Sequence, residues 1–287
     1  MMLSLNLNSD LPLSSFKEAS RLAESAGYSR IWIGESIGFG HSFPLLAVAA
    51  EVTRRIQIGA GILSPQLNRC YHIFRAFQTL REVYGDRFAV ALAPGDAQEV
   101  RSAGATAARP VEVVLECVKE LKRWREEKGW NLPVYVGASG PRLIAEGSTT
   151  ADGVLLNYVH PEYLGWAIRQ MKRKTITAAY GPALLLPDPA NEPLLRAAAT
   201  IVLAGANEAF LREFGLTLQA REAREAMVEK LPNVADQCSL DTFVLAGGLT
   251  ELGIMLRKLS DRGIDEVVLA TPFCRNPEAI RTVASIL

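Results

Sequence analysis

The sequence predicts a single (β/α)8 TIM barrel, in which eight parallel strands form a closed ring inside a layer of helices. Short β-branched runs alternate with amphipathic helical periods, which is the pattern of repeated βαβ units. The chain has 287 residues, close to the roughly 250 that such a barrel needs. Its 49% apolar and 22% charged residues indicate a globular chain with a large core. An open, doubly wound sheet is the alternative that the same alternation allows.

The first half of the chain repeats strand and helix without a break. The first helix, 13–26, has Ser14 or Ser15 as its N-cap and ends at Gly27, a residue that readily adopts the left-handed conformation of a C-cap. Strands are predicted at 3–7, 30–33, 56–62, 88–92, 133–136 and 153–156. The helices that follow the first are predicted at 43–52, 71–84, 111–127 and 141–148.

The second half is less regular. Residues 175–186 are typical of a seventh strand with an extension, and the Ala- and Glu-rich sequence after Pro187-Asp188-Pro189 indicates helices. We expect an irregular or helical insertion over about 175–245, within one domain that spans 1–287. A helix at 249–262, a final strand at 266–270 and a closing helix at 277–287 complete the predicted barrel.

Charge and composition exclude several classes of function. Lys plus Arg and Asp plus Glu both number 31, so no net field attracts nucleic acid or an anionic membrane. No apolar run approaches the roughly 20 residues that span a bilayer, and we expect a cytoplasmic protein that acts on a small molecule. Neither the histidines nor the cysteines have metal-ligand spacing, so no metal is expected. We interpret four widely separated cysteines as isolated thiols: Cys70, Cys117, Cys238 and Cys274.

Two carboxylates follow predicted strands at the mouth of the barrel. Glu35 comes after the second strand and Asp96 after the fourth. Enzymes of this fold place their chemistry at the carboxyl ends of the strands, where burial and mutual repulsion can raise one carboxyl pKa into a range useful for proton transfer. The alternative from spacing alone is that each side chain caps the helix that follows it.

The turn Gly137-Ala138-Ser139-Gly140 is a candidate anion site. It lies between a strand and a helix that begins at Pro141, and free N–H groups at a helix start, together with a hydroxyl, can bind phosphate. A plain strand-to-helix turn is the alternative. The pattern is neither G-x-G-x-x-G nor a Walker loop.

The third strand ends in Gly59-Ala60-Gly61-Ile62. Glycine inside a strand marks a bulge or the close approach of another group to the backbone. A flat ring system packed against bare backbone would require such a sequence, and a simple bulge is the alternative.

Taken together, five segments resemble the bacterial luciferase-like superfamily of flavin and deazaflavin oxidoreductases. Within it they are most similar to the coenzyme F420-dependent methylenetetrahydromethanopterin reductases. The segments that carry the resemblance are 26–35, 56–65, 85–96, 133–141 and 151–157.

The resemblance implies a cofactor ring in the mouth of the barrel, either the 8-hydroxy-5-deazaflavin F420 or FMN. It places a non-prolyl cis peptide at Gly61-Ile62, the cofactor phosphate at the Gly137–Gly140 turn beside Asn157, and proton-handling roles on Glu35 and Asp96. It also implies a homodimer or higher homo-oligomer. The cofactor-binding residues expected on this basis are Asn6, Gly61, Ile62, Leu63, Gly95, Gly137, Ala138, Ser139, Gly140 and Asn157.

The chain departs from the reductase pattern at several positions. Asn6 stands where a Glu is usual, Glu35 where an Asp is usual, and Ser36-Ile37-Gly38 where a His or aromatic residue is usual. The leading hypothesis is hydride transfer between the deazaflavin and a one-carbon-bearing pterin or a related imine-like substrate. The alternatives are an FMN-dependent monooxygenase or reductase and a non-catalytic flavin-binding barrel.

Overall fold

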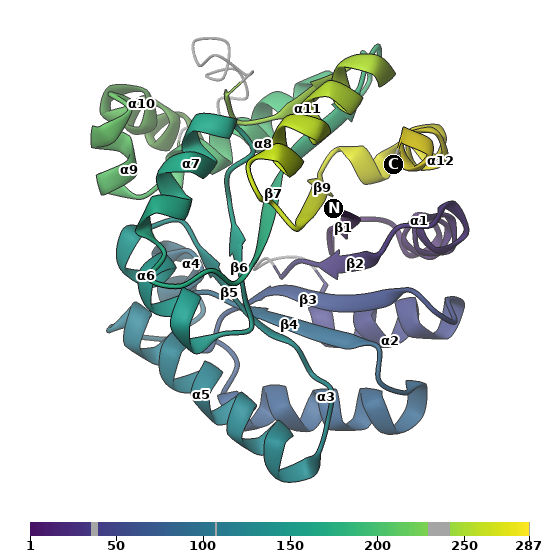
Figure 1. Ribbon diagram of the computed structural model, residues 1–287, viewed down its shortest axis with the longest axis vertical. Helices are drawn as coiled ribbons and strands as arrows, with labels where there is room; N and C mark the ends of the chain where they lie inside the picture. Colours follow the sequence, from purple (N-terminus) through teal and green to yellow (C-terminus); the bar gives the residue numbers. More distant parts are fainter. Residues whose placement is uncertain (36–39, 107, 229–241, 287) are drawn as a thin grey trace.

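The computed structural model describes residues 1–35, 40–106, 108–228 and 242–286. Its parallel strands form a closed ring with helices around the outside (Figure 1). Neighbours around the ring are β6, β5, β4, β3, β2, β1, β9 and β7, and β7 pairs with β6 to close it. The predicted barrel is therefore confirmed, and the open-sheet alternative is wrong.

The strands are β1 (Met2–Leu7), β2 (Arg30–Ile33), β3 (Gln57–Leu63), β4 (Phe88–Leu92), β5 (Val134–Ala138), β6 (Gly153–Leu156), β7 (Ile176–Leu185), β8 (Leu245–Gly247) and β9 (Glu266–Ala270). The α-helices are α1 (Leu13–Ala26), α2 (Ser42–Val52), α3 (Cys70–Tyr84), α4 (Ala97–Ser102), α5 (Pro110–Lys128), α6 (Pro141–Thr150), α7 (Pro161–Gln170), α8 (Glu192–Ala204), α9 (Glu208–Glu213), α10 (Thr217–Val228), α11 (Leu249–Asp261) and α12 (Pro277–Val283). Two 3-10 turns, Phe273–Arg275 and Ala284–Ile286, flank α12.

Strand β7 has the predicted extension. Its first residues pair with β6 and β9, and its end pairs with β8, where Ala183 lies opposite Leu245. Strand β8 lies outside the closed ring and is too short to show a period in the sequence. Helices α8, α9 and α10 follow β7, as the predicted insertion requires, and residues 229–241 of that insertion lie outside the described residues.

Two short helices lie outside the predicted helix ranges, although the sequence contains signals for both. Helix α4 begins after Asp96, and Asp96 with Glu99 resembles a capping box. Helix α7 begins at Pro161, with Glu162 in its first turn, and both are favoured at a helix start.

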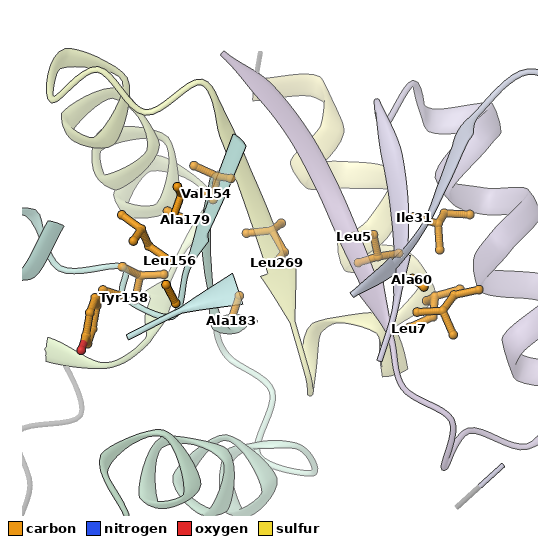
Figure 2. Close-up of a cluster of buried hydrophobic side chains, with 14 of the residues drawn as sticks. Leu5, Leu7, Ile31, Ala60, Val154, Leu156, Tyr158, Ala179, Ala183 and Leu269 are labelled. Carbon is orange, nitrogen blue, oxygen red and sulfur yellow. The ribbon is translucent and has the colours of Figure 1, made fainter. Parts of the chain in front are cut away.

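Side chains on the strands alternate between the outer core and the barrel interior. On β1, Leu5 and Leu7 pack into the outer core, and Figure 2 shows them near Ile31 of β2 and Ala60 of β3. Because side chains along a strand point to opposite faces in turn, Ser4 and Asn6 point into the barrel. Strand β1 thus directs polar side chains into the barrel interior.

The interior contains a charged pair. Glu266 is fully buried, accepts hydrogen bonds from Ser4 Oγ at 2.6 Å and Trp32 Nε1 at 2.8 Å, and pairs with Arg30 Nη1 at 2.7 Å. The Arg30 guanidinium also lies 4.9 Å from the centroid of the Trp32 ring. A buried carboxylate needs such partners, because an unpaired charge in the interior is costly. This pair fixes Trp32 in the centre of the barrel.

The glycines of β3 accommodate that indole. A Cβ on either Gly59 or Gly61 would collide with the six-membered ring of Trp32. The group that approaches the bare backbone of these glycines is thus the protein's own indole, and the register irregularity that the sequence allowed as the alternative is also present, between Gly61 and Leu63.

The prediction of isolated thiols is wrong for two cysteines. Cys70, at the start of α3, forms a disulfide with Cys117 in α5. The two helices pack against each other next to the barrel wall, which brings together residues 47 positions apart in sequence. Cys274 is a buried free thiol, and Cys238 lies outside the described residues. No helix in the described ranges has the length and apolar character needed to cross a membrane.

Candidate active site

Glu35 lies at the end of β2, with its carboxylate held on both oxygens. Asn68 Nδ2 donates to Oε2 at 2.7 Å, Ser42 Oγ donates to Oε1 at 3.4 Å, and His41 Nε2 lies 3.5 Å from Oε1. The side chain is only 12% exposed. These contacts hold the carboxylate at the mouth, where a bound substrate could reach it.

Asp96 is exposed and caps a helix. Its Oδ1 accepts hydrogen bonds from the backbone N–H groups of Gln98 at 2.8 Å and Glu99 at 2.9 Å, at the start of α4. Of the two interpretations that spacing allowed, the capping contact is present in the structure. The residue nevertheless lines the same small pocket as Glu35, together with Ile62, Ser64, Leu67, Gly95, Glu99 and Val100.

Glu99 is a third carboxylate in that pocket and was not predicted as a site residue. Partial burial raises the pKa of the Glu99 carboxyl, and the negative charge of Asp96 raises it further. The signal that could have identified Glu99 is its position three residues after the capping Asp96. The pocket therefore contains a carboxyl group that holds its proton more readily than an isolated Glu.

The end of β3 projects Ile62 into the mouth. The Gly61-Ile62 peptide is cis, as the resemblance implied, and the pairing of β3 with β4 shifts register between Gly61 and Leu63. Ile62 is half-buried and lines the carboxylate pocket. Leu63, expected among the cofactor contacts, is instead buried in the outer core.

Gly95 allows the chain to turn beside Ser64. Its φ is +76°, and a Cβ there would lie 3.2 Å from the Ser64 Cβ. Ser64 Oγ donates to the Pro94 carbonyl at 2.7 Å, which ties the end of β3 to the end of β4. Gly95 thus lines the pocket through its backbone.

The Gly137–Gly140 turn is shaped by close contacts on both sides. A Cβ on Gly137 would lie 2.7 Å from Ile62 Cγ2, and a Cβ on Gly140 would lie 2.5 Å from the amide Nδ2 of Asn207. Ala138 is buried, and the Ser139 carbonyl accepts a hydrogen bond from Tyr158 Oη at 2.7 Å. The turn is therefore closely packed between β3 and the inserted helices.

The same turn leaves backbone donors available. Gly140 is the N-cap of α6 and provides no capping side chain. The N–H groups of Arg142 and Leu143 have no hydrogen-bond acceptor among the described residues. Ala138 pairs with Leu156, which places the half-buried Asn157 next to Ser139. Unsatisfied N–H groups at a helix start attract anions.

Two features therefore lie on either side of Ile62: the pocket that contains Glu35, Asp96 and Glu99, and the Gly137–Gly140 turn. Residues 3–214 match the family described as luciferase-like monooxygenases. The chain belongs to this family. The family resemblance inferred from the sequence, and with it the prediction of an oxidoreductase, is confirmed.

Luciferase-like relatives include several proteins with reductase or dehydrogenase names. The 5,10-methylenetetrahydromethanopterin reductase of Archaeoglobus fulgidus is 25% identical, with 88% of each chain covered. The structure of the coenzyme F420-dependent tetrahydromethanopterin reductase from Methanopyrus kandleri superimposes with a TM-score of 0.86 at 19% identity, covering 100% of this chain and 98% of that one. An F420-dependent secondary alcohol dehydrogenase gives a TM-score of 0.74 at 16% identity, with 100% and 98% covered.

One feature of this luciferase-like barrel departs from the reductase pattern noted above. Asn6 is fully buried at the end of β1, and its Nδ2 donates to the Trp32 carbonyl at 3.1 Å. Its Oδ1 has no donor among the described residues. Asn6 therefore contributes no ionisable group to the mouth. The Ser36-Ile37-Gly38 departure lies outside the described residues.

Within the described ranges, no group of three or more His, Cys, Asp or Glu side chains is arranged to hold a metal ion.

Proposed function

We propose that this protein is an oxidoreductase that transfers a hydride between the deazaflavin coenzyme F420 and a small substrate. The preferred substrate class is a one-carbon-bearing pterin or a related imine-like compound. Membership of the luciferase-like family supports the proposal. The proposal is also supported by the names of relatives, which are a methylenetetrahydromethanopterin reductase and two F420-dependent enzymes.

The position of Ile62 is the observation that carries the proposal. Its side chain contacts the bare backbone of Gly137 on one side and lines the carboxylate pocket with Glu35 on the other. A ring resting on Ile62 would therefore have an anion-binding turn at one end and proton-handling groups at the other. A flavin-like ring with a phosphate-bearing tail has this arrangement of parts.

The residues of the turn fit such a tail. Ile62 and Asn207 occupy the positions of a Cβ on Gly137 and Gly140, and the N–H groups of Arg142 and Leu143, which have no acceptor in the described part of the chain, can bind phosphate oxygens. We assign phosphate binding to the turn and to Asn157. Ile62, with Gly61 and Gly95, would position the ring.

When bound, the coenzyme would supply the hydride chemistry, and the protein would position the reactants and handle protons. Glu35 is mostly buried and is held by Asn68, so we assign it the proton transfer at the substrate. Asp96 stabilises α4 and raises the pKa of Glu99. In this arrangement Asp96 affects the reaction by raising the pKa of Glu99, which holds its proton more readily as a result.

One experiment distinguishes the proposed F420-dependent oxidoreductase from an FMN-dependent enzyme and from a non-catalytic barrel. The purified protein is titrated with F420 and with FMN, and binding is followed by fluorescence quenching. Tight binding of F420, followed by hydride transfer to methylenetetrahydromethanopterin or a related imine-like compound, would support the proposal. Preference for FMN would favour a flavin-dependent monooxygenase or reductase. Binding without turnover of any donor would favour a non-catalytic barrel, for which Asn6 in place of an acid is the sequence argument.

A homodimer remains a prediction from the family resemblance. Light scattering of the purified chain would measure the mass in solution, and a monomer would contradict it.

A further inference from the structure

An asparagine from the inserted helices contacts the Gly137–Gly140 turn. Asn207 lies between α8 and α9, about 70 residues along the chain from Gly140, yet its amide Nδ2 lies 2.5 Å from the position of a Cβ on Gly140. In Figure 1, α9 lies beside α7 on the side of the barrel that carries α6. Only glycine at position 140 allows this approach.

The orientation of the Asn207 amide is fixed by its own helix. Its Oδ1 accepts a hydrogen bond from the backbone N–H of Ala209 at 2.9 Å, as the N-cap of α9. A carbonyl oxygen must face that N–H group, so the NH2 group must face the other way. The Nδ2 atom is therefore directed to the Gly140 side, where it has no hydrogen-bond acceptor among the described residues.

Aromatic packing holds α9 against the turn. Phe210 is fully buried and stacks on Tyr158, with ring centroids 4.4 Å apart. Tyr158 in turn donates its hydroxyl hydrogen to the Ser139 carbonyl at 2.7 Å. This connection from Phe210 through Tyr158 to Ser139 sets the distance between Asn207 and the turn. The amide is consequently a preorganised donor and not a mobile surface group.

We propose that Asn207 donates a hydrogen bond to the phosphate of the cofactor, closing the anion site from the side opposite the start of α6. This inference rests on the proposed function, because the phosphate belongs to the proposed cofactor. The free N–H groups of Arg142 and Leu143 would bind from one side and the Asn207 amide from the other. The inserted helices would then select for a phosphorylated cofactor.

Two substitutions separate this role from capping. Asp and Ser cap helices about as well as Asn, so Asn207→Asp and Asn207→Ser keep the hydrogen bond to Ala209. Asn207→Ser replaces the amide NH2 donor by a shorter hydroxyl, and Asn207→Asp removes the donor and adds a negative charge. Asn131→Asp is the matched control for added charge, because Asn131 is exposed and lies before β5, at the opposite end of the strand from the turn.

The measurement is the dissociation constant of F420 and of its phosphate-free 8-hydroxy-5-deazaflavin core, with FMN and riboflavin as a second pair. Hydrogen bonds to charged groups are among the strong ones. We expect Asn207→Ser to weaken binding of the phosphorylated member about tenfold and Asn207→Asp to weaken it further. The phosphate-free member should bind each variant as it binds the wild type.

The possible results distinguish failure of the Asn207 inference from failure of the proposed function. If the wild type binds a phosphorylated cofactor and both variants bind it equally well, Asn207 is not a phosphate ligand, and the proposed function stands. Equal weakening of both members of a pair would assign Asn207 a structural role instead. If the wild type binds neither pair, the proposed function fails, and this inference fails with it.

Discussion

The Cγ2 methyl group of Ile62 lies 2.7 Å from the position that a Cβ on Gly137 would occupy. The Ile62 side chain at the end of β3 thus occupies the space that a side chain on Gly137, in β5, would need. Because Ile62 also lines the pocket of Glu35, a displacement of Ile62 affects both ends of the proposed cofactor site.

The first prediction concerns this contact. Gly137→Ala should displace Ile62 and weaken cofactor binding by at least tenfold, because packed interiors transmit such an overlap to their neighbours. Gly165→Ala is the control, since a Cβ there meets nothing closer than 3.7 Å and alanine favours the interior of α7. Fluorescence titration measures the affinity. An unchanged affinity in Gly137→Ala would show that Ile62 does not support the cofactor.

Replacement of Glu35 should affect turnover and leave cofactor binding intact. Glu35→Gln keeps the size of the side chain but removes its proton-transfer capacity, and we expect kcat to fall about 100-fold, within the usual contribution of general acid–base catalysis. Glu51→Gln, at an exposed position on α2, controls for the loss of one charge. Single-turnover hydride transfer from reduced F420 gives the rate, and a wild-type rate in Glu35→Gln would exclude the assigned role.

The carboxyl pair at the start of α4 leads to a pH prediction. Asp96→Asn keeps the N-cap, because Asn caps as well as Asp, and removes the charge that raises the pKa of Glu99. The Glu99 pKa should fall toward its ordinary value, which ¹³C NMR titration of the carboxyl measures. Turnover should also fall, while cofactor affinity stays nearly unchanged.

The sign of the associated stability change follows from the direction of the shift. A raised carboxyl pKa means that the folded protein holds this proton more tightly than the unfolded chain. The stabilisation is therefore present below the ordinary Glu pKa and is lost as the pH rises through the raised value. In denaturant unfolding, the free energy of unfolding of Asp96→Asn should therefore fall less than that of the wild type over that pH interval. A wild-type pH dependence would mean that Asp96 does not act on Glu99.

The Cys70–Cys117 disulfide gives a prediction on stability. A bond that closes a 47-residue separation restricts the unfolded chain and contributes about 2–4 kcal/mol to the free energy of unfolding. Dithiothreitol should lower the unfolding free energy of the wild type by that amount. The double variant Cys70→Ser, Cys117→Ser should not respond to the reductant. An equal response in both proteins would contradict a stabilising disulfide.

The sequence by itself determined the order of the ring strands and placed Glu35, Asp96 and the Gly137–Gly140 turn after strand ends. Short apolar, β-branched runs located the strands of the ring, because parallel strands are buried on both faces. Glycine and proline marked the Gly137–Gly140 turn, because the local backbone conformation and the start of a helix depend on residues close in sequence. The family resemblance added the position of the cis peptide, which no local rule provides.

Only the tertiary structure decided which groups meet in space. It placed the Trp32 indole, and not a cofactor, against Gly59 and Gly61. It joined Cys70 to Cys117 and directed Asn207 to Gly140. These contacts link residues tens of positions apart, and they form only when the ring closes and the helices pack around it. Local sequence carries no record of such partners, because each contact depends on the geometry of the whole barrel.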